Sequence, residues 1–252
     1  MKKILILSTA VLVLVWFSFS AEAADKIDDL HATWDKLLKK HVKNGLVNYK
    51  GFANDVKQLD RYLETLEKTG ISTYNREQEL AFWINAYNAY TVKLILDHYP
   101  IKSIRKIDNP WGKRTWKAAG QTLSLDYIEH KILRKKFEEP RIHFAVVCAS
   151  IGCPDLQSFA FQPEKLNDQL ALAARQFFAS PKHFYIKEDK NTIIIHINKI
   201  FSWFGNDFGK TKKERAAFML PYLDKSTAEK LKQAKSLAFK YLPYDWNLNE
   251  KK

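Results

Sequence analysis

The chain's two cysteines, Cys148 and Cys153, lie five positions apart in the stretch HFAVVCASIGCPDL. Thiols at this spacing can form a disulfide, hold a metal or supply a nucleophile. An even number of cysteines in an exported protein favours a disulfide, although closing so short a loop contributes only about 2 kcal/mol. A metal site is less favoured because a lone C-x4-C pair lacks a second pair of ligands, and we expect neither a metal nor another cofactor.

The third alternative makes Cys148 a nucleophile, which requires a lowered thiol pKa and a nearby base. The run RIHFAVVCA, residues 141–149, is apolar and of strand length, and it predicts a buried strand that ends near Cys148. His143 would lie on the opposite face of that strand from Cys148. His130 is therefore the favoured base, and backbone N–H groups of the ASIG turn are candidates for stabilising an oxyanion. The residues alone leave the disulfide and the nucleophile open.

The stretch LSLDYIEHKILRKKF begins with Ser124, a good helix N-cap, and predicts a helix to about Phe137. Glu129 falls within the apolar arc of this helix, whereas the neighbouring His130 points away from its centre. A carboxylate on the core side is costly unless it meets a cation or several donors. Glu129 therefore either pairs with an arginine or acts as a tuned acid or orienting group, with His130 as the base.

The segment NREQELAFWINAYNAYTVKLIL predicts a long helix from about residue 75 to 98 that is buried on all sides. Asn85 and Asn88 interrupt its apolar sequence three residues apart, hence on one face. A buried carboxamide needs hydrogen-bond partners. These asparagines either tie down a neighbouring loop or orient a catalytic histidine or a substrate.

Further patterns predict one α+β domain over residues 24–252, with helices packed on a small mixed or antiparallel sheet. HFYIKEDKNTIIIHI predicts a hairpin, and the piece around AFKYLPYDW reads as extended. The aromatic stretch FSWFGNDFG predicts either a local core under a loop or a wall that stacks on a sugar or peptide.

Residues 1–23 have the pattern of a cleaved signal peptide, with a basic start, an apolar run and a small-residue cleavage site. We therefore expect a periplasmic or secreted protein with no transmembrane segment after cleavage. The formal net charge of +13 favours attraction to an anionic envelope surface. The lysines are spread along the chain rather than concentrated in one tract, which argues against nucleic acid as a partner.

Five motifs in this order over residues 48–248 resemble the domain of unknown function 547 family, as a bacterial exported member. They are FWINAYNAYTVKLIL, LSLDYIEHKILR, IHFAVVCASIGCP, FSWFGNDFG and YLPYDWNLN. The resemblance implies a single α+β domain, and it implies that a cysteine is kept more regularly at Cys148 than at Cys153. Its most characteristic positions in this chain are Asn85, Tyr87, Asn88, Glu129, His130, Cys148 and Pro154. The family is similar to papain-like and transglutaminase-like thiol enzymes, which place the cysteine at a helix N-terminus instead of a strand end.

Together these observations predict an exported thiol-dependent hydrolase or acyl transferase that acts on peptide or amide bonds. Cys148 is the expected nucleophile, His130 the base, and Glu129, Asn85 or Asn88 the orienting group. The alternative is a non-catalytic envelope module with a Cys148–Cys153 disulfide that binds a peptide, a glycan or an envelope protein.

Overall fold

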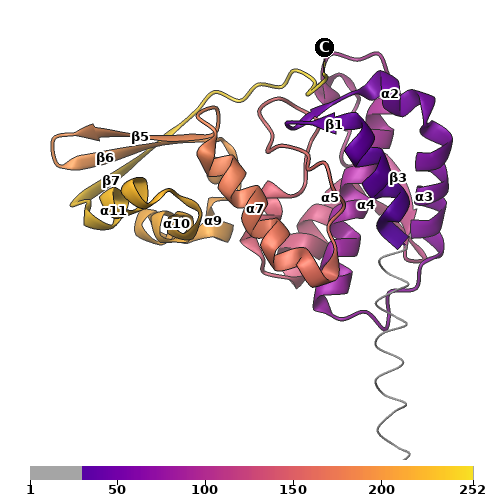
Figure 1. Ribbon diagram of the computed structural model, residues 1–252, viewed down its shortest axis with the longest axis horizontal. Helices are drawn as coiled ribbons and strands as arrows, with labels where there is room; N and C mark the ends of the chain where they lie inside the picture. The colour runs from indigo at the N-terminus through magenta and orange to yellow at the C-terminus, as the bar shows by residue number, and fades with distance from the viewer. Residues whose placement is uncertain (1–29, 252) are drawn as a thin grey trace, which may run out of the picture.

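The computed structural model describes residues 30–251 and has the predicted α+β fold (Figure 1). The first part of the described chain is mainly helical and starts with a helix over residues 30–41. The elements that follow are β1 (Val42–Lys43), β2 (Leu46–Val47), α2 (Tyr49–Asn54), α3 (Val56–Lys68), α4 (Arg76–Leu96), η1 (Ile104–Lys106), β3 (Thr115–Ala118), β4 (Gln121–Ser124), α5 (Leu125–Tyr127), η2 (Ile128–Leu133), α6 (Arg134–Lys136) and η3 (Pro140–Phe144).

The second part carries the largest sheet, flanked by short helices. Its elements are η4 (Pro163–Lys165), α7 (Leu166–Ala179), β5 (Phe184–Asp189), β6 (Thr192–Ile197), α8 (Ile200–Trp203), α9 (Gly205–Phe208), α10 (Lys212–Met219), η5 (Leu220–Tyr222), α11 (Lys225–Gln233) and β7 (Ser236–Tyr241). β5 and β6 form the predicted antiparallel hairpin, and β7 pairs in parallel with β6, so the three-stranded sheet is mixed.

The long helix α4 is the centre of the first part, as its sequence predicts. It begins with a capping box in which Asn75 and Gln78 exchange hydrogen bonds. Nearly all of its residues from Leu80 to Ile95 are buried, because α2, α3, η2 and η4 pack around it. Such an enclosed helix can hold polar side chains in fixed positions.

Two hydrophobic clusters share α7. The residues near its start, Leu166 and Leu170, belong to the cluster built around α4. Residues near its end, such as Phe177 and Phe178, belong to the cluster under the sheet β5–β6–β7. The two parts of the chain are therefore packed through a common helix.

The predicted strand over residues 141–149 is wrong. Pro140 instead starts the 3-10 helix η3, with the Glu139 side chain accepting a hydrogen bond from the backbone N–H of Arg141. The chain then continues without regular structure to Ala149, which has a positive φ of 57°. Apolar character alone cannot separate a buried strand from other buried chain, and here no neighbouring strand supplies a ladder.

The predicted helix over residues 124–137 is present but contains a π-helical segment, η2, between α5 and α6. Ser124 caps its start by accepting from the backbone N–H of Tyr127. A π turn widens the helix and shifts the side chains away from ordinary helical spacing, and such turns are frequent at functional sites. Glu129 and His130 both lie in η2.

The chain after β7 returns to the first part of the molecule (Figure 1). The backbone N–H of Ile151 donates to Asn247 O at 2.9 Å, and that of Gly152 donates to Asp245 O at 2.8 Å. Farther along, Leu248 N donates to Lys102 O. We call residues 148–153, which carry both cysteines, the cysteine loop. We call residues 242–250 the return segment, because they connect the sheet to the cysteine loop and to the α4 cluster.

Residues 1–23, the expected signal peptide, lie outside the described residues, so export stays a prediction. None of the described helices is long and apolar enough to cross a membrane.

Candidate functional site

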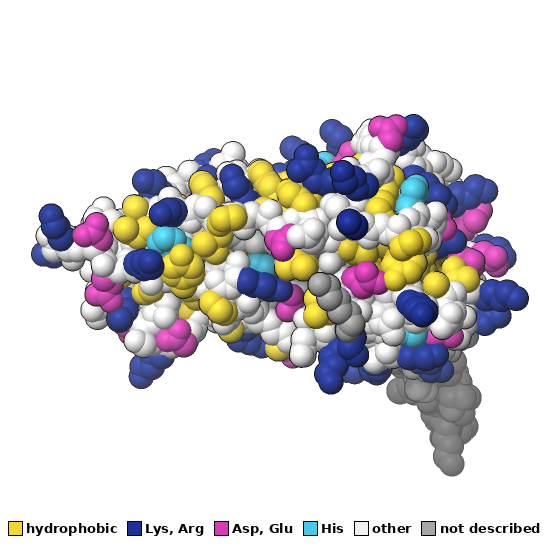
Figure 2. Space-filling model, turned by 90° about the horizontal axis from the view of Figure 1, so that it is seen from above, with side chains coloured by type: hydrophobic (Ala, Val, Ile, Leu, Met, Phe, Trp, Pro, Cys, Tyr) yellow, Lys and Arg dark blue, Asp and Glu magenta, His cyan; other side chains and the backbone are white. Residues whose placement is uncertain are grey.

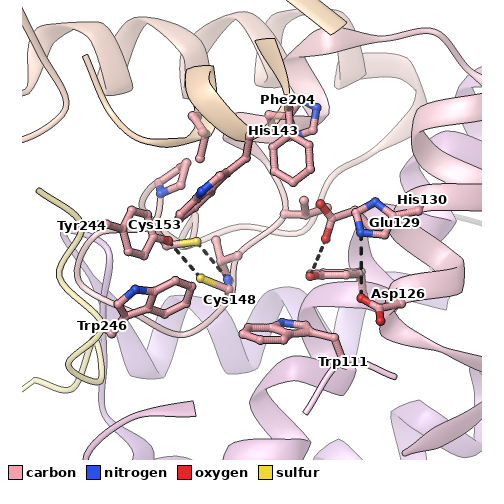
Figure 3. A pocket seen from close by; sticks show the side chains of 16 residues that line it. Trp111, Asp126, Glu129, His130, His143, Cys148, Cys153, Phe204, Tyr244 and Trp246 are labelled. Atoms are coloured by element: carbon pink, nitrogen blue, oxygen red, sulfur yellow. Dashed lines mark hydrogen bonds and ion pairs between the residues drawn. The ribbon is translucent and has the colours of Figure 1, made fainter. Parts of the chain in front are cut away.

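Glu129, His130 and Cys148, three of the predicted site residues, line one pocket of about 190 Å³. Figure 3 shows Glu129 and His130 on one side of it and Cys148, with the return segment, on the other. The full lining is Tyr87, Trp111, Asp126, Glu129, His130, His143, Val146, Val147, Cys148, Cys153, Pro154, Ile200, Trp203, Phe204, Tyr244 and Trp246. The pocket thus joins η2, the cysteine loop, α8 and the return segment.

The Cys148 sulfur lies in hydrogen-bond contact with two hydroxyl groups. Its Sγ is 3.1 Å from Ser150 Oγ and 3.1 Å from Tyr244 Oη. The pKa of Cys148 is lowered to about 7, first by hydrogen bonding to the Cys153 thiol and then by Ser150 and Tyr244, although burial and the charge of Glu129 oppose the shift. Burial and the neighbouring Cys148 raise the pKa of Cys153 well above its ordinary value. Cys148 is therefore the thiol of the pair that ionises first.

Of the alternatives for the two cysteines, the disulfide is not formed in the structure. Both cysteines are free thiols. The Cys153 sulfur instead accepts a hydrogen bond from the backbone N–H of Cys148 at 2.9 Å. The two residues are thus distinguished by their surroundings: Cys148 is half-buried on the pocket, whereas Cys153 is buried.

Asn88 and Asn85 hold backbone segments rather than a histidine. Asn88 Nδ2 donates to Ala145 O at 2.8 Å, and its Oδ1 accepts from the backbone N–H of Val147 at 3.0 Å. Asn85 makes the same pair of bonds to the N–H and C=O of Phe161. Asn88 therefore fixes the chain that leads into Cys148, and Asn85 fixes a loop farther along the sequence.

Glu129 is half-buried without an ion pair to lysine or arginine among residues 30–251. Its Oε2 accepts a hydrogen bond from the Tyr87 hydroxyl at 2.8 Å. Arg114 pairs instead with Asp97 at 2.8 Å, and Arg141 pairs with Glu139 at 2.6 Å. The expected alternative of an arginine partner for Glu129 is thus not realised.

His130 is oriented by Arg134, which lies 3.1 Å from its Nδ1. A guanidinium can only donate, so Nδ1 must accept and the ring proton of neutral His130 must be on Nε2. This Nε2 lies 3.9 Å from Asp126 Oδ1 at the pocket. With the proton on Nε2, the ring can donate a hydrogen bond into the pocket. The sequence instead predicted that His130 is the base. No histidine is a hydrogen-bond partner of Cys148 within the described chain.

His143 is a second histidine of the pocket, which the sequence reasoning set aside. Because residues 141–149 are not a strand, His143 and Cys148 line the same pocket. His143 Nε2 lies 2.8 Å from Asp207 Oδ2, and its ring stacks on Phe204 at 4.4 Å. Donation from Nε2 to the carboxylate leaves Nδ1 with a free lone pair. His143 therefore has the orientation of a general base held by an aspartate.

Asp207 contacts His143 directly, and it is linked to His130 through Arg134. The Arg134 guanidinium binds it through two hydrogen bonds, from Nε at 2.6 Å and from Nη2 at 3.0 Å. Burial opposes ionisation, but hydrogen bonds from His143 and Arg134 hold the pKa of Asp207 well below its ordinary value of 3.8. This aspartate lies in the stretch FSWFGNDFG, for which the sequence predicted a role of the aromatic residues only.

Residues 71–178 match the family model of DUF547, described as protein of unknown function. The chain carries a DUF547 domain. No curated protein and no solved structure matched the chain.

The match to DUF547 includes Glu129, His130, His143 and Cys148 but ends before the groups that complete the site. Asp207 and the return-segment residues Tyr244 and Trp246 follow the matched part of the sequence. The DUF547 segment thus supplies the thiol, whereas chain outside it supplies one of the hydroxyl groups that contact the sulfur.

The backbone of Gly152 permits the return segment to approach the cysteine loop of the DUF547 domain. A Cβ at this position would lie 2.8 Å from the backbone nitrogen of Asp245 and 2.9 Å from the ring of Tyr244. The ASIG turn was expected to offer backbone N–H groups to an oxyanion. Those of Ile151 and Gly152 are instead bonded to the return segment.

Aromatic rings form the walls of the pocket. Trp203 is 46% exposed, and its ring lies 4.8 Å from that of Tyr244. Trp246 lies next to both, whereas Phe201 and Phe208 stack at 4.0 Å inside the core. The aromatic stretch therefore serves as both pocket wall and local core. Residues 30–251 contain no group of three or more His, Cys, Asp or Glu arranged to hold a metal.

Replacement of Tyr244 by phenylalanine should raise the pKa of Cys148, because one hydroxyl that stabilises the thiolate is removed. The rate of alkylation by iodoacetamide, measured against pH, reports the thiolate fraction. We expect the midpoint to move upward by about one unit and the rate at neutral pH to fall several-fold. Tyr127→Phe is the matched control, since Tyr127 is 47% exposed. An unchanged midpoint in Tyr244→Phe would contradict the assigned role.

Proposed function

We propose that the protein is a thiol-dependent hydrolase or acyl transferase that acts on peptide or amide bonds, with Cys148 as the nucleophile. One observation carries this proposal: the Cys148 sulfur, at the wall of a pocket, is contacted by two hydroxyl groups that stabilise its thiolate. A thiol with a pKa of about 7 is substantially ionised at neutral pH. It can therefore attack without a histidine in direct contact.

In the proposed reaction, the thiolate attacks the carbonyl carbon and a C–S bond forms while negative charge moves to the oxygen. His130 donates a hydrogen bond to this oxygen through Nε2–H, because its other nitrogen is occupied by Arg134. The proton lost by the thiol passes to Nδ1 of His143, whose Nε2 bonds Asp207, and is returned to the nitrogen as the C–N bond breaks. Water or an amine then attacks the thioester, His143 takes its proton, and the sulfur is released.

A second candidate function is binding without catalysis, favoured by the aromatic pocket wall. Trp203, Tyr244 and Trp246 lie close together beside the pocket and can stack on a sugar or a peptide. For either function we propose export through residues 1–23 to the periplasm or beyond, and attraction of the basic chain to an anionic envelope surface.

Acetylation by p-nitrophenyl acetate separates the two functions. We expect intact-mass measurement to find one acetyl group, removable by hydroxylamine as a thioester is, together with release of nitrophenol. Cys148→Ala should abolish both signals, whereas Cys153→Ala should retain the acetyl-enzyme and serves as the matched control. Acetylation that persists in Cys148→Ala, or its absence from the native protein, would refute the catalytic proposal.

A further inference from the structure

The formal charges that line the pocket are all negative, in a chain whose net charge is +13. Asp126 and Glu129 contribute carboxylates, and no lysine or arginine of the described chain is among the lining residues. Figure 2 shows a different distribution on the visible outer surface, where lysine and arginine side chains are scattered with acidic groups between them. The pocket is thus an acidic site on a basic protein.

Glu129 is the more buried of the two carboxylates, and it forms no ion pair with a lysine or arginine of residues 30–251, although its charge interacts with Arg134 at longer range. A half-buried carboxylate is costly unless positive charge or several donors compensate for its lost hydration. The Tyr87 hydroxyl is its recorded hydrogen-bond donor, at Oε2, which leaves Oε1 available. His130 is engaged with Arg134 through Nδ1 and is not a hydrogen-bond partner of Glu129. Glu129 therefore has unused capacity to bind a positive group within the pocket.

The aromatic rings around this carboxylate suit a cation. Figure 3 shows the indole of Trp111 between the side with Glu129 and the side with Cys148. The ring of Phe204 is already engaged, with His143 stacked on it at 4.4 Å and the Arg134 guanidinium 4.8 Å from its centroid, so Trp111 supplies the aromatic face. Aromatic faces combined with a carboxylate are the usual means of recognising an ammonium group. The volume of about 190 Å³ suits a side chain or small group and is below that of typical pockets for larger ligands.

We propose that this pocket binds the ammonium group of an amine substrate, of the kind carried by a lysine side chain, between Glu129 and Trp111. The inference rests on the proposed function and refines it, because the amine then becomes the acyl acceptor at Cys148. The carboxylate, the aromatic faces and the thiol lie on one pocket, so the bound nitrogen is next to the reacting carbonyl.

The acyl transfer starts from the thioester at Cys148 and the ammonium bound at Glu129. The ammonium gives one proton to Glu129, and its nitrogen lone pair attacks the thioester carbon to form a C–N bond. The C–S bond breaks, and its electron pair returns to the sulfur. His143 takes a second proton from the nitrogen and passes it to the sulfur, which regenerates the thiol, while Glu129 releases the first proton to solvent. The products are an amide and free Cys148.

Binding of n-butylammonium, a lysine side chain without its backbone, tests the inference directly. The shift in thermal midpoint with ligand concentration gives the affinity. We expect butylammonium to stabilise the protein, with 1-butanol and butyrate having at least tenfold weaker effects. Glu129→Gln should weaken butylammonium binding by about tenfold, because the compensating charge is removed. Glu188→Gln, which changes a carboxylate on β5 outside the pocket, is the matched control.

A second measurement uses the thiol as a reporter. The charge of Glu129 raises the pKa of Cys148, so a cation bound beside Glu129 should lower it. The midpoint of alkylation against pH should therefore move downward with saturating butylammonium but not with 1-butanol. Equal binding of the amine and the alcohol, or unchanged binding in Glu129→Gln, overturns the inference.

The two proposals fail separately. Selective binding of butylammonium without acetylation of Cys148 would keep the ammonium site and remove the catalytic function. Acetylation of Cys148 without selectivity for the amine would keep the nucleophile and remove the ammonium site.

Discussion

Replacement of Asp207 by asparagine should lower the free energy of unfolding by about 3 kcal/mol and reduce acetylation of Cys148 at least tenfold. The substitution leaves the Arg134 guanidinium without its two charged acceptors and removes the carboxylate that orients His143. Denaturant unfolding measures the first effect and nitrophenol release the second. Asp189→Asn, at an exposed position on β5, is the control. Loss of activity with unchanged stability would contradict this account of the network.

The stability effect of Asp207 should depend on pH. Its pKa in the folded protein lies below the ordinary value of 3.8, so its contribution is present above that value and is lost as the pH falls through the folded pKa. The difference in unfolding free energy between the native protein and Asp207→Asn should therefore be large at neutral pH and smaller at about pH 3. A difference that stays constant over this range would show that the carboxylate charge is not responsible.

Replacement of Asn88 by alanine should also destabilise the protein by about 3 kcal/mol, because two buried backbone groups lose their partners. These groups are the C=O of Ala145 and the N–H of Val147, directly before Cys148. Asn85→Ala removes an equivalent pair of bonds at Phe161 and is a closely matched control. We expect both variants to lose similar stability in chemical denaturation.

The two asparagine variants should differ in thiol reactivity. Asn88→Ala should lose most of the iodoacetamide reactivity of Cys148 at neutral pH, since its loop is no longer fixed against Ser150 and Tyr244. Asn85→Ala should retain it under conditions where both variants are folded. Equal reactivity of the two folded variants would show that the loop is positioned by other contacts.

Hydrophobic pattern was sufficient to predict the larger elements. The buried helix α4 and the hairpin β5–β6 follow directly from their periodicity and capping residues. The segment 141–149 was not predictable in this way, because its backbone is held by a side chain from α4 rather than by a strand. Asn88 of α4 thus holds the backbone of residues 145–147 in a conformation that the apolar pattern did not predict.

The sequence predicted the site residues that lie in short motifs, but not those that are brought in by distant contacts. Cys148, Glu129 and His130 stand in short motifs, and the structure places all three on one pocket. His143 was set aside only because the strand was wrong. Asp207 contacts it from 64 residues farther along the chain, a separation that no local pattern reveals. The role of His130 depends on the contact of Arg134 with its Nδ1, and the sequence does not show which ring nitrogen that contact occupies.

The return segment is synthesised after the cysteine loop, yet it supplies one of the hydroxyl groups that contact the Cys148 sulfur. Residues up to Cys153 emerge from the ribosome before Tyr244 has been added to the chain and can contact the Cys148 sulfur. During that interval the cysteine lacks one of the donors that favour its ionisation. Cys148 therefore acquires its full set of hydrogen-bond partners only when residues 242–250 have joined the folded protein.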